Sequence, residues 1–191
     1  MERIRSTVHS TTYSKSRTTI LIISLVSVIA WYGCRDDQLV LSDFDSEADL
    51  DRVKWQCHTL FSIADENATH GNSSLLLELY PSAYPGIAFE LPEHNWSGYT
   101  MLSLDIYNPQ EEVISLAMRI DDRKESPEFN DRYNQSFPLK PGMNHLRIPL
   151  ASMVTTGTKR PINVKNVCRY LLFIAQPQIK RVLYIDYVHL A

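Results

Sequence analysis

The sequence predicts an all-β fold, a two-sheet antiparallel β-sandwich of jelly-roll type, over residues 38–191. Three observations lead to this prediction. Apolar and polar residues alternate along many short segments, glycine and proline fall between those segments, and no linker or repeat interrupts the stretch. An apolar share of 44% with 21% charged residues suits a globular protein, so this stretch should form one domain.

The alternation is clearest in residues 99–107 and 113–121. Each of these segments has one apolar side and one mixed side, as expected of a half-buried antiparallel strand. The apolar side consists of Leu102, Leu104 and Ile106 in the first segment and of Ile114, Leu116, Met118 and Ile120 in the second. Further strands are predicted at residues 39–44, 59–65, 74–80, 86–90, 135–138, 145–149, 167–175 and 182–190.

Turn residues separate the predicted strands. The five glycines beyond residue 38 lie in these gaps or, for Gly86, at the start of a predicted strand, where glycine allows tight turns or a positive φ, and they are Gly71, Gly86, Gly98, Gly142 and Gly157. Only residues 47–54 suggest a helical turn. About ten short strands with a turn every ten or so residues favour a sandwich over other all-β folds.

The N-terminal segment differs from the rest. Residues 1–17 form a basic tail with four Lys or Arg side chains, and residues 18–33 follow as 16 uncharged residues. A helix of that length spans roughly 24 Å, slightly less than the ~30 Å hydrocarbon core of a bilayer. Residues 18–34 are therefore predicted to be a signal anchor, a lipoprotein signal lipidated at Cys34, or a cleaved secretory peptide. The charge bias places the tail in the cytoplasm and the domain outside it, in the periplasm or on the cell surface.

Charge and motifs exclude several classes of function. Residues 18–191 carry 15 basic and 21 acidic side chains without a basic cluster, which argues against nucleic-acid binding. The sequence contains no GxSxG, HExxH or phosphate-binding glycine loop, so no enzyme activity is predicted. Outside the cytoplasm Cys57 and Cys168 could form a disulfide, but two buried thiols explain them equally well.

The mixed sides of the two clearest strands suggest a binding surface. If residues 99–107 and 113–121 are neighbours in one concave sheet, Asp105, Tyr107, Arg119 and Asp121 line it together. Aromatic rings stack on sugar rings and planar polar side chains hydrogen-bond to sugar hydroxyls. The loop 122–134 is expected to fold over the same surface and to add Asp131, Arg132, Tyr133 and Asn134.

Several short motifs in order resemble a known family. They are LSDFD at residues 41–45, HGNSSL at 70–75, NWSGY at 95–99, PGMN at 141–144 and LYID at 183–186. Together they resemble galactose-binding-like jelly rolls, in particular the non-catalytic carbohydrate-binding modules of bacterial envelope and secreted proteins. The stretch 129–137 is also similar to a motif in such domains fused to VanZ-type membrane proteins. The resemblance covers nearly all of residues 38–191.

The resemblance implies a structural Ca²⁺ ion. In similar modules an acidic residue of the first strand and an aspartate of the last strand share calcium with the loop before a central strand. The corresponding residues here are Asp45 and Asp186, with Gly71 and Ser73 in the loop. Carboxylate and carbonyl oxygens are the ligands that calcium prefers.

The resemblance and the residue pattern together predict non-catalytic binding of a polysaccharide or oligosaccharide at the bacterial cell envelope, in the context of exopolysaccharide assembly or export. The alternative is a protein-interaction module that assembles an envelope complex without a sugar ligand. The two hypotheses share one fold because fold does not determine function.

Overall fold

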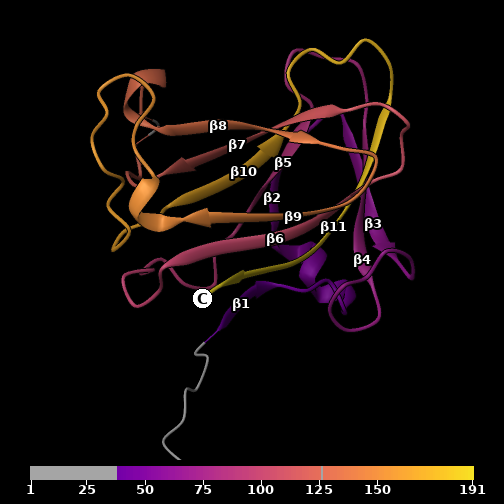
Figure 1. Cartoon of the computed structure of the whole chain (residues 1–191), viewed down its shortest axis with the longest axis horizontal. Coiled ribbons are helices and arrows are strands. Elements are labelled where there is room, and N and C mark those ends of the chain that lie inside the picture. The colour runs from indigo at the N-terminus through magenta and orange to yellow at the C-terminus, as the bar shows by residue number, and fades with distance from the viewer. Residues whose placement is uncertain (1–37, 126) are drawn as a thin grey trace, which may run out of the picture. The chain divides into compact units, whose positions relative to one another are not determined.

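Alternation along each strand decides which side chains form the core. The computed structural model describes residues 38–191 except residue 126, and these residues form two antiparallel sheets packed face to face (Figure 1). Sheet A has the order β3-β4-β11-β6-β9, with β1 also paired to β11. Its strands are β1 (Leu39–Ser42), β3 (Thr59–Ala64), β4 (Ser74–Leu79), β6 (Met101–Asn108), β9 (Gly142–Pro149) and β11 (Arg181–Leu190).

Sheet B has the order β2-β5-β10-β7-β8. Its strands are β2 (Val53–Cys57), β5 (Gly86–Phe89), β7 (Ile114–Asp121), β8 (Tyr133–Leu139) and β10 (Arg169–Phe173). The described residues also contain three short 3₁₀ helices, which are η1 (Glu47–Arg52), η2 (Phe129–Asp131) and η3 (Leu150–Ser152). The predicted all-β sandwich is confirmed.

The core lies between the two sheets and consists of the predicted apolar sides. Leu102, Leu104 and Ile106 of β6 are fully buried, and the apolar residues of β7 pack against the same core. Burying a side chain of this size contributes about 1.5–3 kcal/mol. Trp96 is also fully buried, and its indole Nε1–H donates to the Glu93 carbonyl at 3.0 Å.

All ten predicted strands are present, with shifts of one to three residues at their ends, and one strand was missed. The helical turn predicted at residues 47–54 forms only over η1, after which the chain enters β2. β2 pairs with β5 through a bulge between Val53 and Trp55, which breaks the alternation that would have indicated a strand.

The pairing of strands corrects one prediction. β6 pairs with β11 and β9, whereas β7 pairs with β10 and β8, so the two strands belong to different sheets. The prediction that they are neighbours in one concave sheet is wrong. The segment between them crosses from one sheet to the other, and their outward side chains face opposite surfaces of the sandwich.

Two further predictions concern cysteines and the membrane. Cys57 and Cys168 are both free thiols in the structure. No helix within the described part of the chain is long and apolar enough to span a bilayer. The predicted basic tail and the anchor at residues 18–34 lie outside the described residues.

Candidate functional site

A broad groove runs over the outer face of sheet B. Its floor consists of outward-facing side chains that stand in rows across neighbouring strands. Ala88, Leu171 and Arg119 form one row, and Phe173 and Ala117 stand in the next. The groove has a volume of about 1010 Å³, at the upper end of the range for small-molecule sites. A cavity of this size accommodates several sugar rings.

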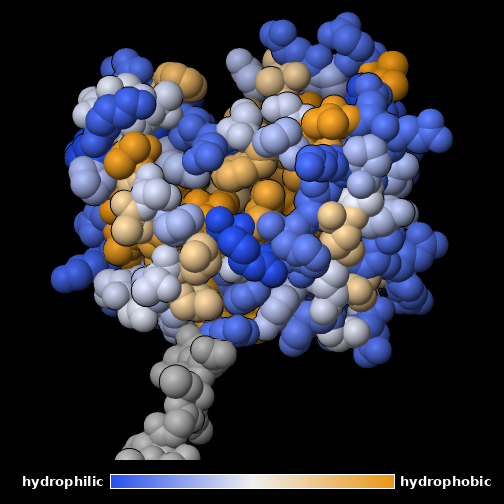
Figure 2. Space-filling model, in the orientation of Figure 1, coloured by the Kyte–Doolittle hydropathy of each residue, from blue (hydrophilic) through white to orange (hydrophobic). Residues whose placement is uncertain are grey.

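Two loops form the sides of the groove, and each carries an exposed aromatic ring. Tyr84 lies before β5 and Phe129 lies in η2, and both residues are more than half exposed. The Tyr84 ring meets Phe173 of the floor edge-on, with 5.8 Å between the ring centroids. Figure 1 shows the two loops rising on opposite sides of sheet B, and Figure 2 shows the surface indented between them.

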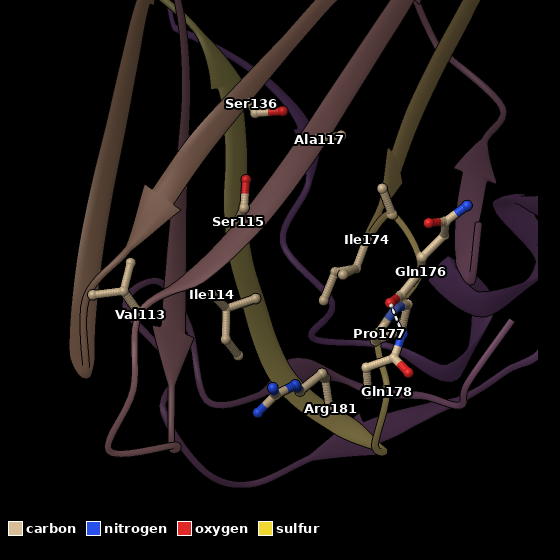
Figure 3. A pocket seen from close by; sticks show the side chains of 11 residues that line it. Val113, Ile114, Ser115, Ala117, Ser136, Ile174, Gln176, Pro177, Gln178 and Arg181 are labelled. Carbon is tan, nitrogen blue, oxygen red and sulfur yellow. Dashed lines mark hydrogen bonds between the residues drawn. The ribbon is translucent and has the colours of Figure 1, made fainter. Parts of the chain in front are cut away.

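A smaller pocket adjoins the groove where β7 begins. It has a volume of about 270 Å³ and lies between the first residues of β7, Ser136 of β8 and the loop before β11 (Figure 3). Ala117, Ser136 and Ala175 line both the pocket and the groove. Gln178 and Arg181 add polar groups to its wall. The pocket therefore adjoins the groove along these three shared residues.

Asp121 fixes two arginines in the groove. Its side chain is fully buried and accepts two hydrogen bonds from Arg119, to Oδ1 at 2.8 Å and to Oδ2 at 2.7 Å. Arg169, which faces Asp121 across the β10–β7 ladder, donates to Oδ2 at 3.2 Å. The paired guanidinium groups are held in place, because two-point contacts to a carboxylate restrict their orientation.

Arg132 is the third arginine of the groove and has no such partner. Its Nε is buried and makes no hydrogen bond within the described part of the chain. The guanidinium carbon lies 5.3 Å from the centroid of the Phe129 ring. Burial lowers the pKa of Arg132 from its usual value, and the like charges of Arg119 and Arg169 lower it further.

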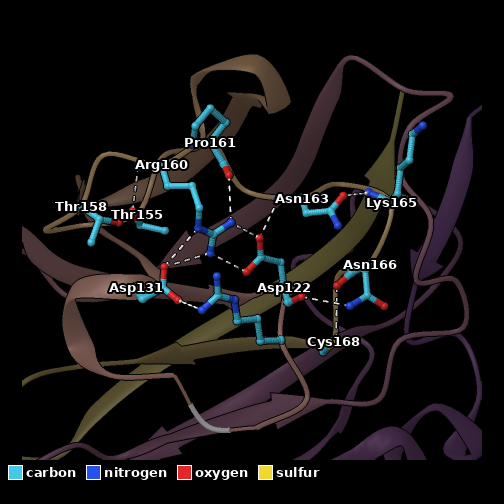
Figure 4. A network of polar contacts seen from close by, with 11 residues as sticks. Asp122, Asp131, Thr155, Thr158, Arg160, Pro161, Asn163, Lys165, Asn166 and Cys168 are labelled. Carbon is cyan, nitrogen blue, oxygen red and sulfur yellow. Dashed lines mark hydrogen bonds and ion pairs between the residues drawn. The ribbon is translucent and has the colours of Figure 1, made fainter.

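A second ion-pair network supports the loop that carries Arg132 (Figure 4). Arg160 donates to both oxygens of Asp122, at 2.6 and 2.9 Å, and to Asp131 at 3.1 Å. Arg123 pairs with Asp131 from the other side, at 2.5 Å. Burial of Asp122 opposes ionisation, but the Arg160 ion pair and the Asn163 amide hold the pKa of its carboxyl below the ordinary value. The network ties the loop 122–131 to residues 155–163.

The structure brings together only some of the predicted ligand-binding residues. Arg119, Arg132 and Asn134 line the groove, and Asp121 lies beneath its arginines. Asp131 belongs to the supporting network instead. Tyr133 points into the core, where burial raises its pKa to about 12 and its hydroxyl donates to Gln135 at 2.6 Å.

Asp105 and Tyr107 lie on the opposite surface, the outer face of sheet A. Asp105 contacts His145 Nδ1 at 2.9 Å and accepts a hydrogen bond from Arg147 at 3.0 Å. The Tyr107 ring packs against Tyr184, with 6.1 Å between the centroids. These residues do not reach the groove, so the predicted common surface with Arg119 and Asp121 is wrong.

The predicted metal ligands converge on one loop. Asp45 accepts hydrogen bonds from the amides of Asn72 and Ser73, and Asp186 accepts them from the amides of Thr69 and His70. Gly71 has a positive φ of 65°, and a Cβ there would overlap the Asp45 carboxylate, so glycine allows this close approach.

The chemistry of this loop fits calcium only in part. Ligand atoms of Asp43, Asp45 and His70 lie within 4.8 Å of one another, and two carboxylates suit the ion. The loop groups that face Asp45 and Asp186, however, are N–H donors rather than carbonyl oxygens. Amide hydrogen bonds therefore already occupy oxygens of both carboxylates, and the ion stays a prediction.

Several groove residues were missed by sequence reasoning. They are Lys54, Glu90, His94, Phe129, Thr156, Cys168, Arg169 and Phe173. Only Phe129 had a sequence signal, because it begins the motif at residues 129–137. The others reach the groove through strand pairing and loop packing, which the alternation of apolar and polar residues along the sequence cannot predict.

No protein-family model and no curated protein matches the chain. Among solved structures, the family 11 carbohydrate-binding module from Clostridium thermocellum, in complex with a β-1,3-1,4-mixed-linked tetrasaccharide, matches with a TM-score of 0.62. The identity is 13%, and the match covers 80% of this chain and 94% of that one.

Two further solved structures show the same similarity. Part of an exo-β-agarase matches with a TM-score of 0.64 at 15% identity, covering 80% of this chain and 25% of that one. The family 30 module of a cellulosomal cellulase of Clostridium thermocellum matches with a TM-score of 0.51 at 12% identity, covering 69% and 81%. The chain thus has the jelly-roll fold of carbohydrate-binding modules, as the sequence resemblance implied.

Proposed function

We propose that this chain binds a polysaccharide without catalysis, in the groove on the outer face of sheet B. The observation that carries the proposal is the groove itself, about 1010 Å³ in volume, with aromatic rings at its sides and fixed polar groups in its floor. Its fold is that of solved carbohydrate-binding modules, one of them in complex with a tetrasaccharide. The pocket at the start of β7 adjoins the groove, which suits an extended chain better than a single sugar.

The polar groups of the groove match the needs of a sugar. Asn134, Gln135 and Thr156 offer amide and hydroxyl groups, which can donate to and accept from sugar hydroxyls. Tyr84 and Phe129 offer ring faces for the C–H surfaces of the sugar. Lys54 and Glu90 form an ion pair of 3.0 Å among the groove-lining residues.

Binding to a panel of soluble polysaccharides by affinity electrophoresis tests the proposal. The full chain is purified in a detergent without a sugar headgroup, because a glycosidic detergent would compete for the groove. Retardation by at least one polysaccharide is expected, and Tyr84→Ala should weaken it about 10-fold through the loss of ring stacking. Tyr107→Ala is the matched control on sheet A and should bind like the wild type. Equal loss in both variants, or no retardation by any polysaccharide, contradicts the proposed site.

We further propose that residues 18–34 hold the domain at the outer side of a bacterial membrane. The support is the basic tail followed by 16 uncharged residues. Protease treatment of intact spheroplasts should digest the domain and leave the tail protected. Mass spectrometry of the wild type and Cys34→Ala separates the two kinds of anchor, since only a lipoprotein carries an acyl-chain mass that the substitution abolishes. A domain that survives protease until the cells are lysed contradicts the outward orientation.

A further inference from the structure

The charge of the groove is opposite to that of the domain around it. Residues 38–191 carry 14 basic and 19 acidic side chains, a net charge of −5. The charged residues that line the groove are nevertheless Lys54, Arg119, Arg132 and Arg169 against Glu90 alone. An acidic domain that gathers three arginines over one sheet face has a local field that attracts anions.

The ion pairs within the groove leave positive charge uncompensated. Glu90 pairs with Lys54, and the buried Asp121 is shared between Arg119 and Arg169. One carboxylate thus balances two guanidinium groups, and Arg132 adds a third without an acidic partner among the described residues. Two positive charges therefore remain in the groove.

Arg132 in particular is placed to receive an acceptor. Its Nε is buried without a hydrogen-bond partner, which destabilises the protein unless something supplies one. A guanidinium group presents parallel N–H donors that match a carboxylate or a similar planar or tetrahedral oxyanion. Arg119, Arg132 and Arg169 line the same groove, and the like charges of Arg119 and Arg169 disfavour the charged form of Arg132 while Asp121 partly offsets them, so an anion beside Arg132 would add to that offset.

We infer that the groove recognises an acidic polysaccharide, and that an anionic group on a sugar ring pairs with Arg132 while Arg119 and Arg169 contribute to the field around it. This inference rests on the proposed function and adds the class of its ligand. The shared chemistry is an oxyanion on a sugar, either the carboxylate of a uronic acid or a sulfate ester. The uncharged stacking surfaces of Tyr84 and Phe129 hold the rings between the charges.

Titration calorimetry on the full chain, again in a detergent without sugar groups, tests the inference with paired ligands. Polygalacturonate, alginate and hyaluronan are compared with their carboxyl-reduced forms, and dextran sulfate with dextran. At least one acidic polymer should bind 10-fold or more tightly than its neutral partner, and its affinity should fall as NaCl is raised from 50 to 500 mM. Preference for a uronate or for a sulfate identifies the source of the oxyanion, and either one supports the inference.

Arg132→Gln supplies the matched variant. It should weaken binding of the acidic polymer about 10- to 100-fold and leave the melting temperature unchanged or higher, because the buried Nε that is lost makes no hydrogen bond to the described part of the chain. Arg147→Gln removes the same charge from sheet A and should not alter binding. A lower melting temperature in Arg132→Gln without a change in affinity would assign Arg132 a structural role and overturn the inference.

The remaining outcomes distinguish failure of the acidic-ligand inference from failure of the proposed polysaccharide binding. Equal binding of acidic and neutral forms overturns the acidic ligand and leaves polysaccharide binding intact. Polyglutamate that competes as well as the acidic polysaccharides shows that charge alone is recognised, which also overturns the inference. Absence of binding to every polymer, charged or neutral, contradicts the proposed function itself.

Discussion

The outer faces of the two sheets each carry a buried aspartate held by basic side chains, and the broad groove lies on sheet B. On sheet A the loop between β3 and β4 lies against the surface, where the amides of Thr69 and His70 donate to Asp186. The His70 ring stacks on Tyr187 at 4.3 Å between centroids. On sheet B the flanking loops stand at the sides, and the buried Nε of Arg132 has no hydrogen-bond partner among the described residues. On sheet A the chain's own loop covers part of the outer face. On sheet B the face between the loops stays open to a ligand.

The largest difference between the two faces is expected at the central aspartates. Asp121→Ala leaves Arg119, with only 15% of its side chain exposed, and Arg169 without their carboxylate, so the free energy of unfolding should fall by about 3 kcal/mol. Asp105→Ala leaves His145 and Arg147, which are about half exposed and can turn to water, so the loss should be about 1 kcal/mol. Urea unfolding of both variants measures the difference. Equal losses would show that the groove arginines are as well solvated as those on sheet A.

The next largest effect concerns the network that holds the loop of Arg132. Asp122→Asn removes the two-point ion pair with Arg160 and should cost about 2 kcal/mol. The pKa of Asp122 is lowered in the folded protein, so its contribution is present above the ordinary pKa of 3.8 and is lost as pH falls through the lower, folded value. Stability measured from pH 6 down to pH 2 should therefore fall less steeply in Asp122→Asn than in the wild type. An identical slope in both proteins would exclude Asp122 as a source of acid sensitivity.

The sequence predicted which side chains face the core better than it predicted which side chains share an outer surface. Alternation reports whether a side chain faces the core, and every predicted apolar position of β6 and β7 is buried. It does not report which sheet a strand joins, because pairing depends on contacts between residues far apart in the chain. Asp105 and Asp121 both occupy polar positions of alternating segments that follow each other in the sequence. They nevertheless lie on opposite surfaces, because the two strands belong to different sheets.

The candidate site shows the same limit at the level of single residues. Arg119 was found because its strand is strongly alternating, and Arg132 because it lies in a recognisable motif. Arg169 had neither signal and enters the groove only because β10 places it opposite Asp121. Tyr133 was mistaken for a surface residue because a tyrosine beside polar residues gives no sign of which way the chain turns after η2.

The smallest expected effect tests whether sheet A also has an external partner. If the predicted Ca²⁺ binds at the loop that contacts Asp45 and Asp186, 10 mM CaCl₂ should raise the melting temperature after chelator treatment. With a dissociation constant of about 10⁻³ M, within the range of extracellular modules, mass action at this concentration stabilises the protein by about 1.4 kcal/mol. Asp45→Asn should abolish the shift, and MgCl₂ at the same concentration should not reproduce it, since magnesium demands a smaller, octahedral site. No shift with calcium would mean that the amides of residues 69–73 are the permanent partners of these carboxylates, so that sheet A is completed by the chain alone and only sheet B depends on a ligand.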